Sequence, residues 1–111
     1  MIQEKTIARR KKETNDGCDL YTFIMDFKGG TYVSQVKAKN KDDACIIWAR
    51  ALKIEDIEDF KIVDKQAIAF ELTKEEVTPI THNINVWMIC LDILGNFSII
   101  HIIKTEKTIE R

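Results

Sequence analysis

The fold is decided by a β-hairpin in residues 20–38, LYTFIMDFKGGTYVSQVKA. Four apolar residues alternate along its first half and would share one side of an extended strand: Tyr21, Phe23, Met25 and Phe27. This period of two predicts a strand with one buried face, and the β-branched, aromatic return segment predicts its partner. Gly29-Gly30 would supply the positive φ angles of a two-residue turn, so that Phe27 faces Tyr32. We therefore expect an antiparallel hairpin over residues 19–39.

A second hairpin is predicted near the C-terminal end, in residues 84–105. Its strands, residues 86–93 and 97–105, flank a turn at Gly95-Asn96. Both faces of this hairpin are apolar, which is typical of a central strand that is covered on both sides. The N-terminal arm, the middle of the chain or a second copy could supply the second cover, so a homodimer stays open.

One helix is predicted between the hairpins, in residues 40–53. Asn40 is a good N-cap, and Asp43 lies three residues further on, as in a capping box. Apolar residues follow the i, i+3, i+4, i+7, i+8 spacing of a buried stripe: Ala44, Ile47, Trp48, Ala51 and Leu52. We expect this face of the helix to cover the sheet.

Residues 54–80 mix acidic and apolar residues that follow no single period. The segment 64–77 fits a short second helix ended by Pro79, because proline continues a helix poorly. A strand through residues 67–72 is the alternative. We favour the helix.

These elements predict one α+β domain over residues 1–111, an antiparallel sheet of two β-hairpins with one or two helices packed on one face. Residues 1–18 have the pattern of an arm and a turn. The sequence lacks a stretch of about 18 apolar residues and the apolar core of a signal peptide. Cys18, Cys45 and Cys90 are odd in number and far apart, which does not fit a disulfide framework. We expect a reduced, cytoplasmic protein with no membrane partner.

The net charge of −1 conceals an uneven distribution along the chain. Residues 1–15 carry five basic and two acidic side chains, a net of +3. Residues 40–76 carry six basic and ten acidic side chains, a net of −4. The balanced total argues against a protein that binds nucleic acid over its whole surface, while the acidic middle indicates a basic partner.

Catalysis has one candidate constellation in this sequence. With the second turn at Gly95-Asn96, Cys90 faces His101 across the hairpin, as a thiol nucleophile and its base would. The dense apolar surroundings favour instead a core thiol and a half-buried histidine. There is no nucleotide-binding loop and no metal-ligand spacing, so we expect no cofactor, no metal and no catalytic residue. A small Cys/His enzyme remains an alternative.

The basic run Arg9-Arg10-Lys11-Lys12 could contact phosphate groups. It has no interleaved aromatic residues, so a solvated arm explains it more simply. A nucleic-acid-associated accessory protein that uses this arm is the second alternative function.

Three stretches, FIMDFKGGTYVSQVKA (23–38), DDACIIWARAL (42–52) and NINVWMICLDILGNFSIIHIIKT (83–105), occur in this order. Together they resemble the small immunity proteins of bacterial polymorphic toxin systems, including those of contact-dependent growth inhibition. The resemblance spans residues 21–52 and 83–105. It implies a cytoplasmic, non-enzymatic protein that binds one cognate toxin domain, often a nuclease, and occludes its active site or substrate cleft.

Toxin contacts are expected in the acidic middle of the chain, because nuclease clefts are basic and complementary charge accelerates association. The expected contacts are the following acidic residues: Asp42, Asp43, Glu55, Asp56, Glu58, Asp59, Glu71 and Glu75. Paired carboxylates can also perform acid–base catalysis, although a solvated acidic face is far commoner.

Overall fold

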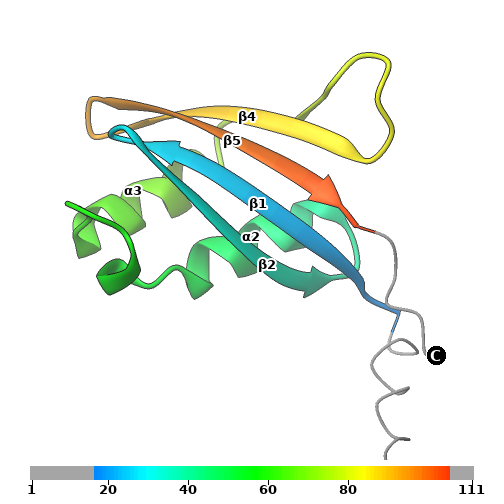
Figure 1. The fold of residues 1–111 in the computed structure, drawn as a ribbon, viewed down its shortest axis with the longest axis horizontal. Coiled ribbons are helices and arrows are strands. Elements are labelled where there is room, and N and C mark those ends of the chain that lie inside the picture. Colours follow the sequence, from blue (N-terminus) through cyan, green and yellow to red (C-terminus); the bar gives the residue numbers. More distant parts are fainter. Residues whose placement is uncertain (1–16, 106–111) are drawn as a thin grey trace, which may run out of the picture.

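A five-stranded antiparallel sheet forms one layer of the molecule, and two helices pack against one of its faces (Figure 1). The computed structural model describes residues 17–105. Its elements are β1 (Asp19–Phe27), β2 (Gly30–Ala38), α2 (Lys41–Ala51), the 3₁₀ turn η1 (Ile54–Asp56), α3 (Ile62–Glu71), β3 (Thr78–Pro79), β4 (Val86–Ile93) and β5 (Asn96–Lys104). The predicted α+β fold with two hairpins is therefore confirmed, and β3 is a short strand that the sequence did not predict.

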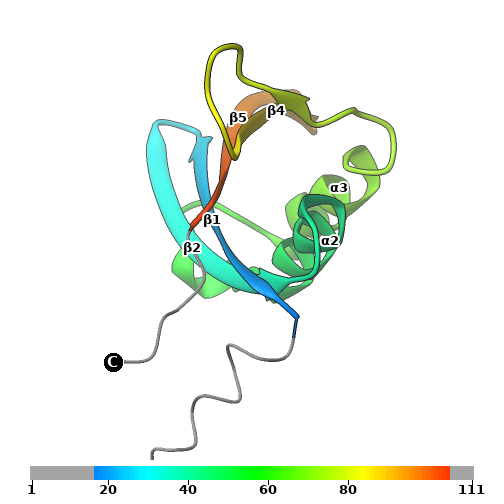
Figure 2. The ribbon, with the colours of Figure 1, turned by 90° about the vertical axis from the view of Figure 1, so that its right-hand side faces the viewer.

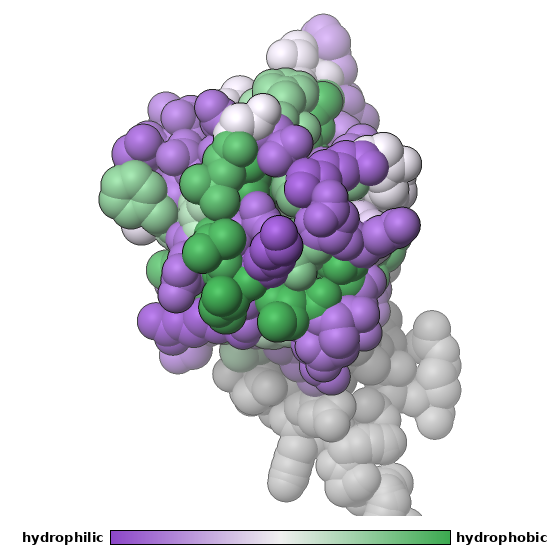
Figure 3. All heavy atoms as spheres, turned by 90° about the vertical axis from the view of Figure 1, so that its left-hand side faces the viewer, coloured by the Kyte–Doolittle hydropathy of each residue, from purple (hydrophilic) through white to green (hydrophobic). Residues whose placement is uncertain are grey.

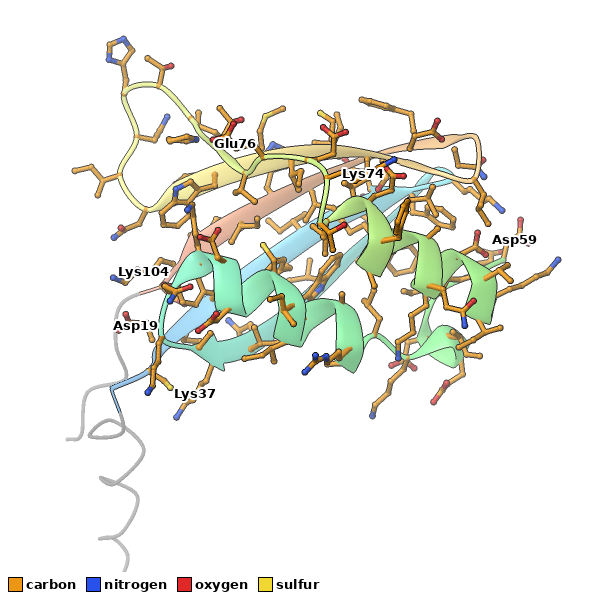
Figure 4. The ribbon with its side chains drawn as sticks, turned by 180° about the vertical axis from the view of Figure 1, so that it is seen from behind. Asp19, Lys37, Asp59, Lys74, Glu76 and Lys104 are labelled. Atoms are coloured by element: carbon orange, nitrogen blue, oxygen red, sulfur yellow. The ribbon has the colours of Figure 1, made fainter. Side chains whose placement is uncertain are left out.

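The two hairpins join through β1 and β5, giving the strand order β2-β1-β5-β4-β3. Figure 2 shows that the sheet curves around the helices, which lie on its concave side. Phe23 of β1 lies opposite Ile102 of β5, and both are fully buried. At the far end of this pairing Lys104 Nζ lies 3.3 Å from Asp19 Oδ2. Figure 4 shows these two residues at the same end of the sheet. Alternation of apolar residues along β1 therefore places one complete face in the core.

Both hairpin turns lie one residue earlier than expected. The central residues are Lys28-Gly29 and Leu94-Gly95, and φ is positive at all four positions. A type I′ turn needs positive φ at both central residues and favours glycine at the second of them. Phe27 consequently pairs with Gly30 rather than with Tyr32. Because the register shift is two residues, the buried face of each strand stays as predicted.

Helix α2 starts as predicted, since the Asp43 backbone N–H donates to Asn40 Oδ1 over 2.8 Å. Its buried stripe differs from the expected one. It consists of the following side chains: Ala44, Cys45, Trp48, Ala49 and Leu52. Ile47 and Ala51 are exposed. Trp48 stacks on Phe23, and this contact sets the rotation of the helix about its axis. Cys45 and Ala49 therefore face the sheet in place of Ile47 and Ala51.

The helix expected between 54 and 80 is confirmed as α3, and the strand alternative is wrong. Asp64 starts the helix, because its Oδ2 accepts the Lys61 backbone N–H over 2.7 Å. The helix ends at Glu71, well before Pro79, where the Thr73 hydroxyl donates to the Phe70 carbonyl over 2.6 Å. Pro79 instead belongs to β3 and pairs with β4.

The convex face of the sheet carries half-buried apolar side chains, among them Ile24, Met88 and Ile99. The expected second cover is not found within residues 17–105, where both helices lie on the concave side (Figure 2). The predicted arm lies, up to residue 16, outside the described residues. None of the described helices is long and apolar enough to span a membrane.

Candidate protein-binding surface

The eight acidic residues predicted as contacts do not form one patch. Asp42 and Asp43 lie in the first turn of α2, a second group occupies residues 55–59, and Glu71 and Glu75 lie at and after the end of α3. In Figure 4 Asp59 lies at one end of the molecule, far from Glu76 on the segment that follows α3. The group at residues 55–59 therefore faces a part of the surface that it does not share with the acidic residues after α3.

A groove of about 620 Å³ between α2 and the segment after α3 brings Asp42 and Glu75 to one rim. Its floor is apolar and includes the Cys45 thiol, while Lys41 and Arg50 add positive charge to the rim. Burial, helped by the Asp42 carboxylate, raises the pKa of Cys45 to about 11. The thiol is therefore protonated at neutral pH and is a poor nucleophile.

In the acidic group at residues 55–59, one carboxylate is ion-paired and three are unpaired. Asp59 Oδ2 lies 3.0 Å from Lys28 Nζ, and this hydrogen bond holds the pKa of the Asp59 carboxyl below its usual range. Glu55, Asp56 and Glu58 are exposed, and none makes a side-chain hydrogen bond or ion pair with another described residue. These three charges are available to a partner.

An exposed apolar cluster lies at the same end of the molecule, on α3 and the β4–β5 turn. Val63, Phe70 and Leu94 are 48%, 60% and 61% exposed and line one shallow hollow of about 510 Å³. Glu71 and Asp92 stand at its margin. We call this set of five residues the end patch. Figure 3 shows hydrophobic surface gathered on this end of the molecule with hydrophilic residues around it.

Sequence reasoning missed the end patch, although part of its signal is visible. Val63 and Phe70 are seven residues apart and therefore share one helix face, opposite the buried Ile68. Because α3 is apolar on two faces, its sequence follows no single period, and residues 54–80 therefore fit both a helix and a strand. Leu94 comes from a distant turn, so only the fold brings it beside the helix.

Leu94 occupies a conformation that leucine rarely adopts. Its φ of 52° lies in the left-handed region, which costs an ordinary L-residue about 1–2 kcal/mol. The turn itself is well made, because the Gly95 N–H donates to Asp92 Oδ1 over 2.7 Å. Asparagine or glycine would suit this position locally. The protein thus exposes a large apolar side chain at a strained position, where nothing in the fold requires one.

In the second hairpin Cys90 and His101 do not face each other, contrary to the register that the sequence predicts. Cys90 pairs with Ile99, and His101 pairs with Met88, because the turn is centred on Leu94-Gly95. Both side chains are half-buried on the convex face of the sheet. In residues 17–105 no group of three His, Cys, Asp or Glu residues is arranged to hold a metal ion. The basic run at residues 9–12 lies outside the described residues.

Comparison with known proteins gave no relative: no protein-family model, curated protein or solved structure matches this chain. The class is therefore set by the fold, an α+β protein with one antiparallel sheet and two helices on its concave face. Its exposed end patch and the unpaired carboxylates nearby are the surface features on which a function can be argued.

Proposed function

We propose that this protein is a protein-binding inhibitor that docks through the end patch, and that its partner is a bacterial toxin domain which it neutralises as an immunity protein. Leu94 is the observation that carries the proposal. Exposure of its side chain and the left-handed backbone are both unfavourable for the free protein. A partner that buries this side chain would offset both costs.

The composition of the end patch supports a protein partner. Protein interfaces have a desolvated centre with aliphatic or aromatic anchors and a polar rim. Val63, Phe70 and Leu94 would form such a centre, and Glu71 and Asp92 its rim. Phe70 is the aromatic anchor.

The unpaired carboxylates support a basic partner. Glu55, Asp56 and Glu58 precede α3 in the chain and share its end of the molecule (Figure 1). Like charges grouped at the same end of the molecule as an apolar patch attract an oppositely charged protein and accelerate its encounter. A nuclease toxin with a basic substrate cleft fits this requirement, and an inhibitor bound there would exclude the nucleic acid.

Coexpression tests the proposal. The C-terminal domain encoded by the gene immediately upstream should arrest growth when produced alone, and coexpression of this protein should restore growth. The two proteins should also copurify. A neighbour that is harmless, or a toxic one that this protein neither binds nor neutralises, would contradict the proposed function.

A matched pair of variants tests the docking face itself. Phe70→Ala removes an exposed anchor of the end patch, and we expect it to weaken binding by about tenfold or more. Ile84→Ala removes an apolar side chain that is 85% exposed but lies outside the patch, and it should leave binding unchanged. Equal effects from the two variants would remove the end patch from the interface.

A further inference from the structure

Strand β2 lies at the edge of the sheet, and within residues 17–105 no other strand pairs with its outer side. Phe27 and Gly30 flank the two-residue turn, so they form a hydrogen-bonded pair. Hydrogen-bonded and non-hydrogen-bonded positions alternate from there. The backbone N–H and C=O groups of Val33 and Gln35 therefore point away from β1 and out of the sheet.

Along residues 30–36 this edge lacks the features that usually keep edge strands from pairing, and Lys37 near the end of β2 is the one charged residue of the strand. Natural edges carry charges, prolines or bulges that discourage the addition of another strand. Residues 30–36, GTYVSQV, contain no charged residue and no proline, and the pairing with β1 is regular along the whole strand. Val33, in the middle, is 64% exposed. The edge is open to a partner strand.

A hollow of about 280 Å³ runs beside this edge, between β2 and the end of α2 with η1. Tyr32, Ser34 and Val36 line it with side chains from the concave face, and Trp48 lies opposite them. The Trp48 indole N–H donates to Ser34 Oγ over 3.0 Å and holds the helix against the strand. Val33 and Gln35 also line the hollow, although their side chains belong to the convex face. These two residues contribute the backbone N–H and C=O groups that point out of the sheet.

We propose that β2 binds an extended segment of a partner protein, which adds a sixth strand to the sheet and places alternate side chains in this hollow. Backbone hydrogen bonds along an edge give affinity, and the pocket beside it gives specificity. The inference rests on the proposed function, because the toxin domain is the protein expected to supply the segment.

The charged residues around the hollow indicate which kind of segment would bind there. Asp56 and Lys53 are the two charged residues that line the hollow, and Lys65 lies beside it, with its Nζ donating to the Leu52 carbonyl over 2.7 Å. The unpaired Glu55 and Glu58 lie on either side of Asp56 in the chain, so three carboxylates stand against two ammonium groups around the hollow. The bound segment should therefore carry a lysine or arginine among the side chains that enter the hollow. A second copy would bring Tyr32, Ser34 and Val36 from its own β2, and these offer no cation. The net negative charge of the residues around the hollow thus favours a basic strand of another protein.

Two substitutions at Val33 test this proposal. Val33→Pro removes an N–H that points out of the sheet, so the β1–β2 ladder is kept, and edge strands tolerate proline. Val33→Thr keeps the N–H and the branched shape. With the upstream toxin domain as partner, we expect Val33→Pro to weaken binding by about tenfold or more, and Val33→Thr to bind like the unsubstituted protein. Thermal unfolding should show that both variants stay folded.

The outcomes separate this inference from the proposed function. A toxin domain that does not bind the unsubstituted protein contradicts the proposed function, whereas binding that Val33→Pro leaves intact contradicts the strand site. Random phage-displayed peptides of about ten residues, one strand in length, test the edge without the toxin. Enriched peptides should carry Lys or Arg among alternating β-branched residues and should fail to bind Val33→Pro. No enrichment, or binders indifferent to Val33→Pro, overturns the proposal.

The oligomeric state supplies the last test. Sedimentation should show a monomer for the unsubstituted protein and for Val33→Pro alike. A dimer that Val33→Pro dissociates would assign the β2 edge to a second copy and would overturn a partner strand as its occupant.

Discussion

The indole of Trp48 lies flat against the ring of Phe23, with centroids 4.8 Å apart and planes within 5° of each other. The same indole donates a hydrogen bond to Ser34 on the neighbouring strand. One side chain therefore ties α2 to both β1 and β2. It also forms a wall of the hollow beside the β2 edge, so stability and the proposed strand site depend on the same contact.

Replacement of Trp48 should show how much of the fold rests on this contact. We expect Trp48→Ala to lower the free energy of unfolding by about 3–5 kcal/mol, because it leaves a cavity at the centre of the core. Trp48→Phe keeps an aromatic ring and should cost about 1–2 kcal/mol. Urea unfolding followed by circular dichroism measures both. Similar losses for the two variants would show that the hydrogen bond to Ser34, and not the ring contact, dominates.

Elements with a local signal could be predicted from the sequence. Alternation along residues 20–27 predicts the buried face of β1, because side chains on a strand project alternately to its two sides. Asn40 predicts the start of α2, because an N-cap acts within one turn. These features depend on neighbouring residues alone, and the structure confirms them.

Features that depend on distant partners could not be predicted in the same way. The turn centres were misplaced because Lys28 and Leu94 adopt positive φ, which their side chains disfavour and only the completed hairpin imposes. The buried stripe of α2 rotated toward Cys45 and Ala49 because Trp48 packs on Phe23. The end patch and the β2 hollow each join segments that are far apart in the sequence.

The Lys28–Asp59 ion pair should make stability depend on pH in acid. The pKa of Asp59 is lower in the folded protein than in the unfolded chain, so its contribution is present above about pH 4 and is lost as the pH falls through the folded value. Asp59→Asn should therefore lower the melting temperature at pH 7, and the two melting temperatures should converge in acid. Asp56→Asn, at an unpaired carboxylate, is the control and should cause no such change at neutral pH. Parallel curves for Asp59→Asn and the unsubstituted protein would show that the pair contributes nothing.

Cys45 should resist thiol reagents in the native protein. With its pKa near 11, the thiolate fraction at pH 8 is about a hundredfold below that of an ordinary cysteine, and the side chain is also buried. Alkylation with iodoacetamide, followed by mass spectrometry of the separate peptides, should modify the half-buried Cys90 before Cys45. In urea the difference should disappear. Rapid native labelling of Cys45 would indicate that the groove between the helices opens.

Charge reversal at Glu55 and Asp56 should slow association with a basic toxin domain. We expect Glu55→Lys/Asp56→Lys to reduce the association rate by about tenfold at low salt and to weaken its salt dependence, with a smaller effect on dissociation. Asp42→Lys at the start of α2 makes the same kind of change outside both proposed contact regions. Stopped-flow kinetics at several ionic strengths would distinguish them. If Asp42→Lys slowed association as strongly per charge, overall charge rather than the acidic group at 55–58 would govern the encounter.

Leu94→Asn should separate stability from binding. Asparagine accepts the left-handed conformation of a type I′ turn more readily than leucine, so the free energy of unfolding should rise by about 1 kcal/mol. The same substitution removes an apolar anchor from the end patch and should weaken toxin binding by about tenfold. Lys28→Asn makes the equivalent change in the first turn but also removes the Asp59 ion pair, so its gain in stability should be smaller. A protein made more stable by Leu94→Asn that still binds its partner at full strength would show that the strained leucine is not kept for docking.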